Sequence, residues 1–235
     1  MIAWLVIILL FILLYLLNIL VCMVYCKMKK KQEKVLHDFE ACDTYSTQQP
    51  RGIKYTIKQL LNGWMIYSVK CLGKVPCQWY RKFILKYVYQ MELGKNVVIY
   101  GDFFIRAPWN ISVGEGTIIG DSCQLDGRNG LVIGKNVNFS TAVYIYTEQH
   151  DVNDAYFRSN DSGGTVVIED YVWLSSRTTV LPKVRVGQGA VLASGALANK
   201  DLEAFGVYVG IPAKKIGNRS QDLKYEFDGD YLPFI

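Results

Sequence analysis

Histidine is scarce in this 235-residue chain, which contains only His37 and His150. A zinc centre with three histidine ligands therefore cannot be assembled around His150. Cysteine is also sparse: the six cysteines, at positions 22, 26, 42, 71, 77 and 123, show no paired metal-ligand spacing. They need no disulfides and suit a reducing compartment.

Charge is absent from the first 25 residues, where Asn18 is the only strongly polar side chain. A helix of this length spans about 37 Å, which exceeds a hydrocarbon core of roughly 30 Å. A secretory signal peptide is the competing interpretation, but the chain lacks its basic start, its shorter apolar run and its small-residue cleavage site. We therefore expect residues 1–25 to form a retained, single-pass transmembrane anchor.

Lysine follows this apolar run at once, at positions 27, 29, 30, 31 and 34. The positive-inside rule puts such a cluster on the cytoplasmic side of the membrane and the short N-terminus outside. We expect a protein of the cytoplasmic (inner) membrane whose residues after the anchor lie in the cytoplasm.

Positive charge is concentrated in a linker region, residues 26–92. Residues 51–92 carry eight Lys or Arg and one acid, whereas residues 93–235 carry 13 basic and 16 acidic side chains. Helical spacing predicts two amphipathic helices here, with apolar residues at Ile57, Leu60, Leu61 and Trp64, and at Tyr80, Phe83, Ile84, Tyr87 and Met91. Such helices lie in the membrane interface or cap the following domain, and both interpretations can hold. No nucleic-acid motif accompanies the charge, so we expect no nucleic-acid partner.

An apolar residue recurs every six positions in the second half of the chain. The uninterrupted run is Ile168, Leu174, Val180, Val186, Leu192 and Ala198. Earlier residues keep the interval in three further registers: Leu93, Ile99 and Ile105; Val113, Ile119 and Leu125; Ile133, Phe139 and Ile145. This period fits neither an α-helix nor an ordinary strand, and it is typical of a β-helix whose triangular coils each contain three short strands. Fifteen hexads predict a mainly β domain of about five coils over residues 93–216, with a tail over 217–235.

Glycine follows the inward residue in five hexads, at Gly94, Gly114, Gly120, Gly134 and Gly187. Corners favour residues that tolerate positive φ, so we expect these glycines to form the corners. Half of the chain is hydrophobic, so a freely chosen phase would find some apolar residues by chance. The run from Ile168 to Ala198 keeps one register through six consecutive hexads, which chance does not readily explain.

One long interruption separates Ile145 from Ile168. The interval is 23 residues, 17 more than one hexad requires, and it contains the only histidine of the coil domain, His150. A lone histidine is usually structural or merely exposed. Function nevertheless concentrates in the long loops of regular scaffolds, so His150 is a candidate catalytic residue.

These features together resemble the hexapeptide-repeat acyltransferases, in particular the branch of maltose, galactoside and colanic-acid O-acetyltransferases. The resemblance covers about residues 93–216, and its markers are Thr147 to Asp151, Trp173 within residues 170–175, residues 180–193 and residues 210–216. It implies a left-handed parallel β-helix, an exception to the right-handed crossover rule. It also implies a homotrimer with the active site between adjacent coils.

The resemblance implies an acetyl-CoA-dependent O-acetyltransferase that uses no metal, acts on a saccharide such as an envelope or lipid-linked glycan, and employs His150 as general base. A neutral imidazole can take the proton of a hydroxyl as its oxygen attacks a thioester. Alignment of both substrates makes a covalent acyl-enzyme unnecessary. Asp151, Asp154 or a backbone carbonyl orients the ring, and the spacing leaves this choice open.

For the donor, the resemblance implies that Trp173 walls the site, that Ser176 contacts the thioester end and that Ser194 lets pantetheine lie along the coil. The remaining cofactor-binding candidates are Asn199, Lys200, Pro212, Lys214 and Lys215. Each serine or lysine is equally an ordinary solvent-facing residue, and Trp173 has core packing as its alternative. The acceptor-side asparagine of sugar acetyltransferases is not evident here, which leaves as candidates Asp121, Asp126 and Arg128.

Other functions remain open on the same scaffold. N-acetylation of an amino sugar nucleotide is the main enzymatic alternative, and a non-catalytic scaffold protein is the main non-enzymatic one. Long-chain transfer from acyl carrier protein fits less well, because Trp173 and residues 210–216 resemble a CoA site. A carbonic anhydrase would need three histidines on zinc, and the coil has one.

Overall fold

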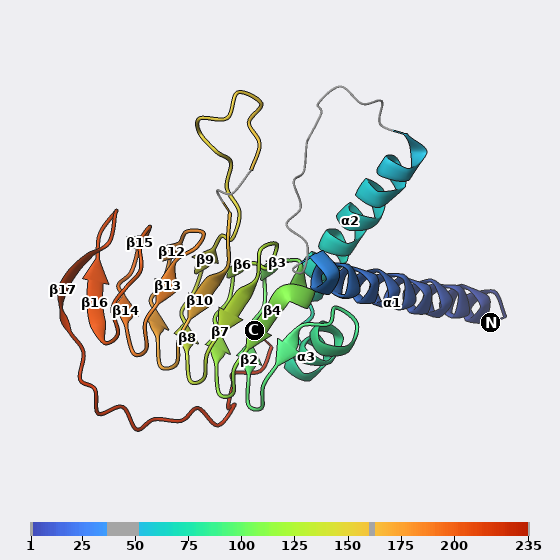
Figure 1. Ribbon diagram of the computed structural model, residues 1–235. Coiled ribbons are helices and arrows are strands. Elements are labelled where there is room, and N and C mark those ends of the chain that lie inside the picture. The colour runs from blue at the N-terminus through green and yellow to red at the C-terminus, as the bar shows by residue number, and fades with distance from the viewer. Residues whose placement is uncertain (1, 37–51, 160–162, 235) are drawn as a thin grey trace.

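The computed structural model describes residues 2–36, 52–159 and 163–234, which form a prism of stacked triangular coils with three helices at its first coil (Figure 1). The helices are α1 (Ile2–Leu36), α2 (Ile53–Leu72) and α3 (Gln78–Tyr87). Helix α1 projects away from the first coil, whereas a long loop between β9 and β10 stands out from the side of the prism.

Three parallel sheets form the faces of the prism. Sheet A contains β1 (Glu92–Leu93), β4 (Ile111–Val113), β7 (Leu131–Ile133), β10 (Val166–Ile168) and β13 (Arg185–Val186). Sheet B contains β2 (Val98–Ile99), β5 (Ile118–Ile119), β8 (Asn138–Phe139), β11 (Trp173–Leu174), β14 (Val191–Leu192) and β16 (Gly206–Val209), with β17 (Lys214–Asn218) antiparallel at its end. Sheet C contains β3 (Phe104–Arg106), β6 (Gln124–Asp126), β9 (Tyr144–Ile145), β12 (Thr179–Val180) and β15 (Leu197–Ala198).

The period of six and its fifteen inward residues are confirmed. In sheet B, Leu174 pairs with Phe139 on one side and with Leu192 on the other. In sheet C, Val180 pairs with Ile145 in the same way. All fifteen are buried except the partly buried Leu93 of the first coil. The core is therefore a stack of aliphatic residues along one axis, as the sequence predicts.

An incomplete sixth turn follows the five predicted coils. Leu202 bridges to Val186 of sheet A, and Tyr208 pairs with Leu192 of sheet B. Leu202 follows the last inward residue, Ala198, after only four positions, so the period of six could not identify this turn.

The five glycines after inward residues have a different role from the one predicted. None of them has a positive φ; that conformation occurs two positions later, for example at Gly116. A Cβ atom on Gly114 would lie 2.5 Å from the carbonyl carbon of Gly134, and one on Gly120 would lie 2.6 Å from the carbonyl oxygen of Ser140. These glycines are required because successive coils approach each other too closely for a side chain.

The three corners of the prism, here named the A–B, B–C and C–A edges after the sheets that they connect, differ in regularity. All three insertions into the hexad spacing lie on the C–A edge. They are the turn with a short 3-10 helix (Pro108–Asn110) in the first coil, residues 127–130 in the second coil and residues 146–165 in the third. One edge therefore carries every insertion.

The A–B edge is covered by the C-terminal segment, residues 219–232, which we name the strap. Figure 1 shows it returning from the last coil to the first along the outside of the prism. Its Arg219 Nη1 donates to the carbonyl of Tyr171 at 2.9 Å, and its Leu232 amide donates to the hydroxyl of Tyr100 at 3.3 Å. The sequence did not predict this segment's role.

Helix α3 covers the open end of sheet B, where the first strand would otherwise expose unpaired backbone groups. The buried Arg81 donates to the carbonyl of Ile99 at 3.1 Å, and Lys82 Nζ donates to that of Val97 at 2.9 Å. Burial lowers the pKa of the Arg81 guanidinium and of the Lys82 ammonium. Both basic residues thus serve the cap, which was one of the two interpretations of this region.

Helix α2 packs on the coil domain through a face other than its apolar stripe. Met65, Val69 and Leu72 are buried against the coil domain, whereas the predicted stripe of Ile57, Leu60, Leu61 and Trp64 is exposed. On α3, Ile84 is buried as expected, but Phe83 and Tyr87 are exposed and in mutual contact. The stripe around α3 therefore packs on the coil through Tyr80, Ile84 and Met91, whereas the stripe on α2 does not.

Helix α1 contains one segment, Trp4–Gln32, that is long and apolar enough to cross a membrane. The second half of this helix is fixed to the coil domain. Tyr25 contacts Trp109 edge to face, with ring centroids 6.0 Å apart, and Lys30 pairs with Glu92 at 2.8 Å. If the exposed first half crosses a membrane, the first coil lies next to the membrane surface.

Candidate active site

His150 lies in the loop of residues 146–165, here named the His150 loop, which leaves the C–A edge in the third coil (Figure 1). Its Nδ1 atom is 2.8 Å from the carbonyl oxygen of Phe157, and its ring stacks on the Phe157 ring with centroids 4.0 Å apart. A carbonyl oxygen can only accept a hydrogen bond, so the hydrogen-bond network assigns the proton to Nδ1. In neutral His150, Nε2 is then the basic nitrogen, on an exposed ring whose orientation is held from one side.

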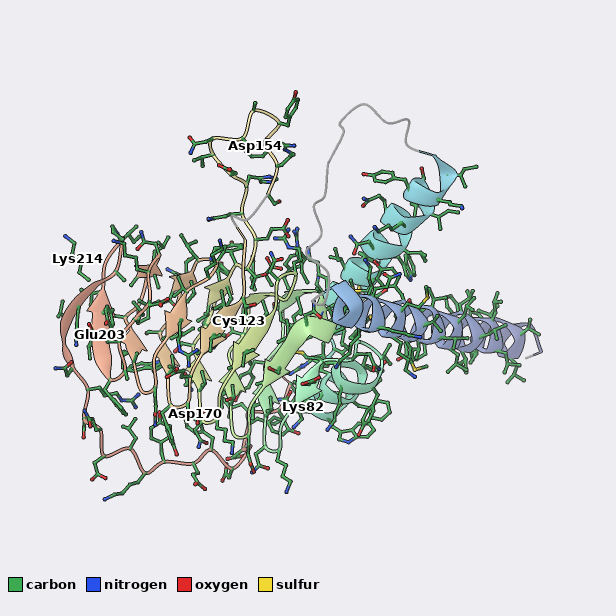
Figure 2. All side chains as sticks on the ribbon, in the orientation of Figure 1. Lys82, Cys123, Asp154, Asp170, Glu203 and Lys214 are labelled. Atoms are coloured by element: carbon green, nitrogen blue, oxygen red, sulfur yellow. The ribbon has the colours of Figure 1, made fainter. Side chains whose placement is uncertain are left out.

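The two aspartates predicted as partners of His150 bind other groups. Asp154 forms an ion pair with Arg158 at 2.7 Å, and Asp151 accepts a hydrogen bond from the amide of Asn153 at 2.9 Å. Figure 2 shows Asp154 well away from the coils, within the projecting loop. Of the three candidates for orienting the ring, the backbone carbonyl is the one in contact with it.

Asp126 and Arg128 lie together at the foot of the His150 loop. Arg128 bridges two carboxylates, with contacts of 2.7 Å to Asp126 and 3.1 Å to Glu148. Burial alone would raise the pKa of the Asp126 carboxyl, but hydrogen bonds from the Arg128 side chain and backbone outweigh it and lower this pKa. The Asp126 carboxylate also accepts from the amide of Thr147 at 3.3 Å. These bonds connect the second coil to the start of the His150 loop.

A pocket of about 130 Å³ opens beside this cluster. Asp126 and Arg128 line it together with Phe104, Gln124 and Tyr146. Two aromatic residues beside a few polar groups suit a ring that carries hydroxyl groups, since apolar walls enclose the ligand and polar groups orient it. Because two of the predicted acceptor-side residues line it, we name this cavity the acceptor pocket.

Trp173, Ser176, Ser194 and Asp121 lie elsewhere, on or beside the B–C edge. Trp173 is outside the core: its side chain is 43% exposed, and its Nε1 atom donates to Ser140 Oγ at 3.2 Å. The Ser194 hydroxyl contacts that of Ser175 at 2.7 Å, next to Ser176. An exposed indole face beside small hydroxyl residues can accommodate an extended ligand along this edge.

The remaining donor candidates meet at the end of the prism. Asn199 and Lys200 are exposed in the turn after β15. The β16–β17 turn contains Pro212 and is attached to β15 by a hydrogen bond from the Ala213 amide to the Leu197 carbonyl, 2.8 Å long. Figure 2 shows Lys214 pointing away from the last coil.

Lys215, next to Lys214, is already paired with Glu203 at 2.7 Å. Its side chain bond to Glu203 raises the pKa of Lys215 and lowers that of Glu203. Lys214 therefore offers an uncommitted cation within the described part of the chain, and Lys215 offers a partly neutralised one.

Within one chain, the predicted residues thus fall into three groups, on the C–A edge of the second and third coils, on the B–C edge, and at the last turns of the prism. His150, Asp126 and Arg128 belong to the C–A edge. Trp173 lies in sheet B, and Ser194 lies on the B–C edge. Asp121, which like Asp126 is an acceptor-side candidate, falls in the second group, where it accepts a hydrogen bond from the Thr141 hydroxyl at 2.7 Å. Among the described residues, no group of three or more His, Cys, Asp or Glu could hold a metal ion.

Three residues of the C–A edge were missed from the sequence. Phe157 holds His150 through its backbone, and backbone contacts leave no mark on residue type. Glu148 pairs with Arg128, and Arg106 flanks the acceptor pocket. The position of Arg106 was predictable, because it directly follows the inward residue Ile105 where the first insertion begins.

Known proteins agree with this architecture, although the chain matches no protein-family model. WcaF of Escherichia coli (strain K12), named for colanic acid biosynthesis as an acetyltransferase, is 31% identical over 140 residues, which cover 60% of this chain and 75% of WcaF. The dTDP-4-amino-4,6-dideoxy-D-glucose acyltransferase of Escherichia coli is 30% identical over 161 residues, covering 56% of this chain and 84% of that enzyme.

A solved structure has the same fold. The hexapeptide-repeat acetyltransferase of Vibrio cholerae O1 biovar eltor, in complex with acetyl coenzyme A, superposes with a TM-score of 0.60 over 72% of this chain and 91% of that chain, at 18% identity. Together with the confirmed hexads, the relationship to WcaF identifies the family: the chain belongs to the hexapeptide-repeat acetyltransferases, enzymes built on the parallel β-helix.

Proposed function

We propose that this protein is a membrane-anchored O-acetyltransferase that transfers the acetyl group of acetyl-CoA to a hydroxyl of a saccharide. The observation that carries the proposal is the geometry of His150, an exposed imidazole held through Nδ1 on the longest excursion of an acetyltransferase coil. A hydroxyl is a poor nucleophile at neutral pH and needs a base, and Nε2 of His150 can serve as one.

In the proposed reaction, Nε2 of His150 takes the proton of the acceptor hydroxyl while the hydroxyl oxygen bonds to the thioester carbonyl carbon. The carbon–sulfur bond then breaks, and the imidazolium returns the proton to the leaving thiolate. The backbone N–H or the hydroxyl of Ser176 stabilises the negative charge on the carbonyl oxygen. Asp151 and Asp154 shape the His150 loop through their own bonds and take no proton.

The donor site follows the B–C edge toward the end of the prism. Trp173 walls it and Ser194 leaves room for an extended pantetheine arm. The phosphates of CoA bind to the residues around the last turns: Asn199, Lys200, Pro212, Lys214 and Lys215. The exposure of Trp173 and the uncommitted charge of Lys214 support this assignment. The acetyl-CoA complex of the Vibrio cholerae protein supports the choice of donor.

The acceptor is a saccharide bound in the acceptor pocket. Asp126 and Arg128 line this pocket at the foot of the His150 loop, and Asp121 assists from the B–C edge. The association of WcaF with a biosynthetic pathway for colanic acid supports a glycan acceptor.

We further propose a homotrimer, because in a single chain His150 and the donor residues lie on different edges of the prism, with sheet C between them. A neighbouring copy brings its His150 loop to the B–C edge of the first, and the site is completed between the two chains. Closed cyclic symmetry of this kind is common among homo-oligomers. Three α1 helices then anchor one enzyme to the cytoplasmic face of the membrane, with lysines 27, 29, 30 and 31 on that side.

N-acetylation of an amino sugar nucleotide is the second candidate, and the similarity to the dTDP-4-amino-4,6-dideoxy-D-glucose acyltransferase favours it. Purified full-length protein is tested with acetyl-CoA and paired acceptors that differ only in a hydroxyl or an amino group. Transfer to the hydroxyl is expected, and transfer to the amine alone would exclude O-acetylation.

The catalytic assignment is tested with His150→Ala, matched by His37→Ala in the linker. Loss of a general base lowers kcat about 100- to 10,000-fold, and the control is expected to retain full transfer. Binding of CoA to each variant is measured by calorimetry. If His150→Ala binds CoA like the wild-type protein but transfers the acetyl group more slowly, His150 acts as a base. Absence of binding and of transfer in the wild-type protein would favour a non-catalytic scaffold.

A further inference from the structure

A second cavity, of about 290 Å³, lies where α1 and α2 meet the first two coils. Tyr25 and Lys29 line it from α1, Lys58 and Asn62 from α2, and Arg106 from β3. We name it the basic cavity. The pairing of Tyr25 with Trp109 and a 3.5 Å hydrogen bond from the Tyr25 hydroxyl to Asn62 fix its walls.

Positive charge dominates this cavity. Its lining includes Lys29, Lys58, Arg106 and Arg128, and none of the described lining residues is acidic. Arg128 is neutralised by Asp126 and Glu148, but Lys29, Lys58 and Arg106 form no ion pair with any residue that the structure describes. Three cations that converge without a carboxylate repel one another, and an anionic ligand would relieve that repulsion.

The basic cavity also lies between the apolar helix and the acceptor pocket. On one side, Lys29 lies two positions after Lys27, the first charged residue of α1. On the other side, Arg106 and Arg128 line both this cavity and the acceptor pocket, so the two spaces share a wall. The apolar helix, the basic cavity and the acceptor pocket are thus arranged in that order along the molecule.

We propose that the basic cavity binds the diphosphate group of a saccharide that is linked to a membrane lipid. This inference rests on the proposed acetyl transfer to a saccharide and adds how the acceptor is delivered. The lipid chain lies against the exposed apolar residues of α1, the diphosphate binds Lys29, Lys58 and Arg106, and the saccharide enters the acceptor pocket.

The chemistry of the lining fits a diphosphate better than a single carboxylate. Lysine ammonium and arginine guanidinium groups form strong, charge-assisted hydrogen bonds with phosphate oxygens. Asn62 and Gln59 add neutral polar groups to the same wall. A nucleoside diphosphate sugar carries the same anion, but it has no lipid chain to contact the exposed apolar residues of α1.

The test measures direct binding to the full-length protein in phosphatidylcholine nanodiscs. The probes are a polyprenyl diphosphate, the corresponding polyprenol, thymidine diphosphate and inorganic pyrophosphate. We expect the polyprenyl diphosphate to bind at least 10-fold more tightly than each of the others. Equal binding of the polyprenol would refute the anion site, and tighter binding of thymidine diphosphate would assign the cavity to a soluble nucleotide sugar.

The residues are tested with Lys29→Gln/Lys58→Gln. We expect about 100-fold weaker binding of the polyprenyl diphosphate, roughly tenfold for each charge-assisted hydrogen bond lost. The matched control is Lys54→Gln/Lys70→Gln, which removes two exposed charges from α2 outside the cavity and should change binding less than about twofold. Equal losses in both variants would indicate nonspecific attraction and contradict the proposal.

A parallel assay of transfer from acetyl-CoA to a soluble saccharide separates the two hypotheses. Transfer by the wild-type protein without selective lipid binding would refute only the basic cavity. Selective lipid binding without transfer to any acceptor would refute only the proposed function.

Discussion

The A–B edge and the C–A edge of the prism are made by the same chain with the same repeat, yet they differ in almost every property. The A–B edge keeps its spacing in all five coils, uses glycines where coils touch and is covered by the strap. The C–A edge carries every insertion, both cavities and His150. Regular turns hold the coils together, and the C–A edge accepts insertions because they leave the inward residues undisturbed.

The strongest test of the regular edge is Gly114→Ala. The new Cβ would lie 2.5 Å from the Gly134 backbone, which cannot move without shifting a whole coil. We expect the free energy of unfolding to fall by about 3 kcal/mol in denaturant titrations. The control, Gly217→Ala in β17, meets no atom within 4 Å and should change stability by less than about 0.5 kcal/mol. Equal stability of the two variants would remove the close-approach argument.

Asp126→Asn is the substitution on the C–A edge that should also cost stability. It removes the buried partner of Arg128, and we expect a loss of about 2 kcal/mol. Because the folded pKa of Asp126 is lowered, its contribution is present above the ordinary value of 3.8 and is lost as the pH falls through the folded pKa. Unfolding measured from pH 7 down to pH 2 should therefore show the two proteins converging in acid. A constant difference would contradict the ion pair.

Phe157→Ala should affect transfer and leave the fold intact. The side chain is 68% exposed, so its loss costs little stability, but His150 loses the ring on which it stacks. We expect kcat to fall about tenfold, since a mispositioned base is a weaker catalyst, with an unchanged melting temperature. The exposed neighbour Tyr156 provides the control Tyr156→Ala, and an equal fall in kcat there would argue against the stacking contact.

Arg219→Ala tests the strap and should have the smallest effect. It removes a hydrogen bond to Tyr171 and a cation–π contact with Tyr225, worth about 1 kcal/mol together. Lys224→Ala, at a highly exposed position of the same segment, is the matched control. We expect a melting temperature several degrees lower for Arg219→Ala and equal transfer rates for both variants. A change in rate would show that the two edges are coupled.

The sequence predicted what depends on side-chain type and spacing. Fifteen inward residues, from Leu93 to Ala198, were identified because a core selects apolar residues at a fixed period. The sequence also placed the long loop and its histidine. It could not select the Phe157 carbonyl over Asp151 or Asp154, since backbone contacts are independent of residue type.

The apolar pattern does not show which face of a helix packs on the coil. The stripe of Ile57 and Trp64 on α2 is exposed, and the helix packs through Met65 and Val69, which are equally apolar. Gly114 was assigned to a corner conformation because composition alone does not distinguish an unusual φ from a close contact. The two insertions of two residues each follow the third hexad of a coil, so their spacing in the sequence indicates that they share an edge.

The strap changes how such a coil can fold. In a stack of repeats that contact only their neighbours, terminal coils can fray without disturbing the others. Here Leu232 binds Tyr100, 132 positions earlier in the chain, so the first coil is secured by residues far downstream of it in the sequence. Fraying from either end breaks contacts along the whole A–B edge. The coil should therefore melt as one cooperative unit, and it should acquire its full resistance to proteolysis only after the strap has closed.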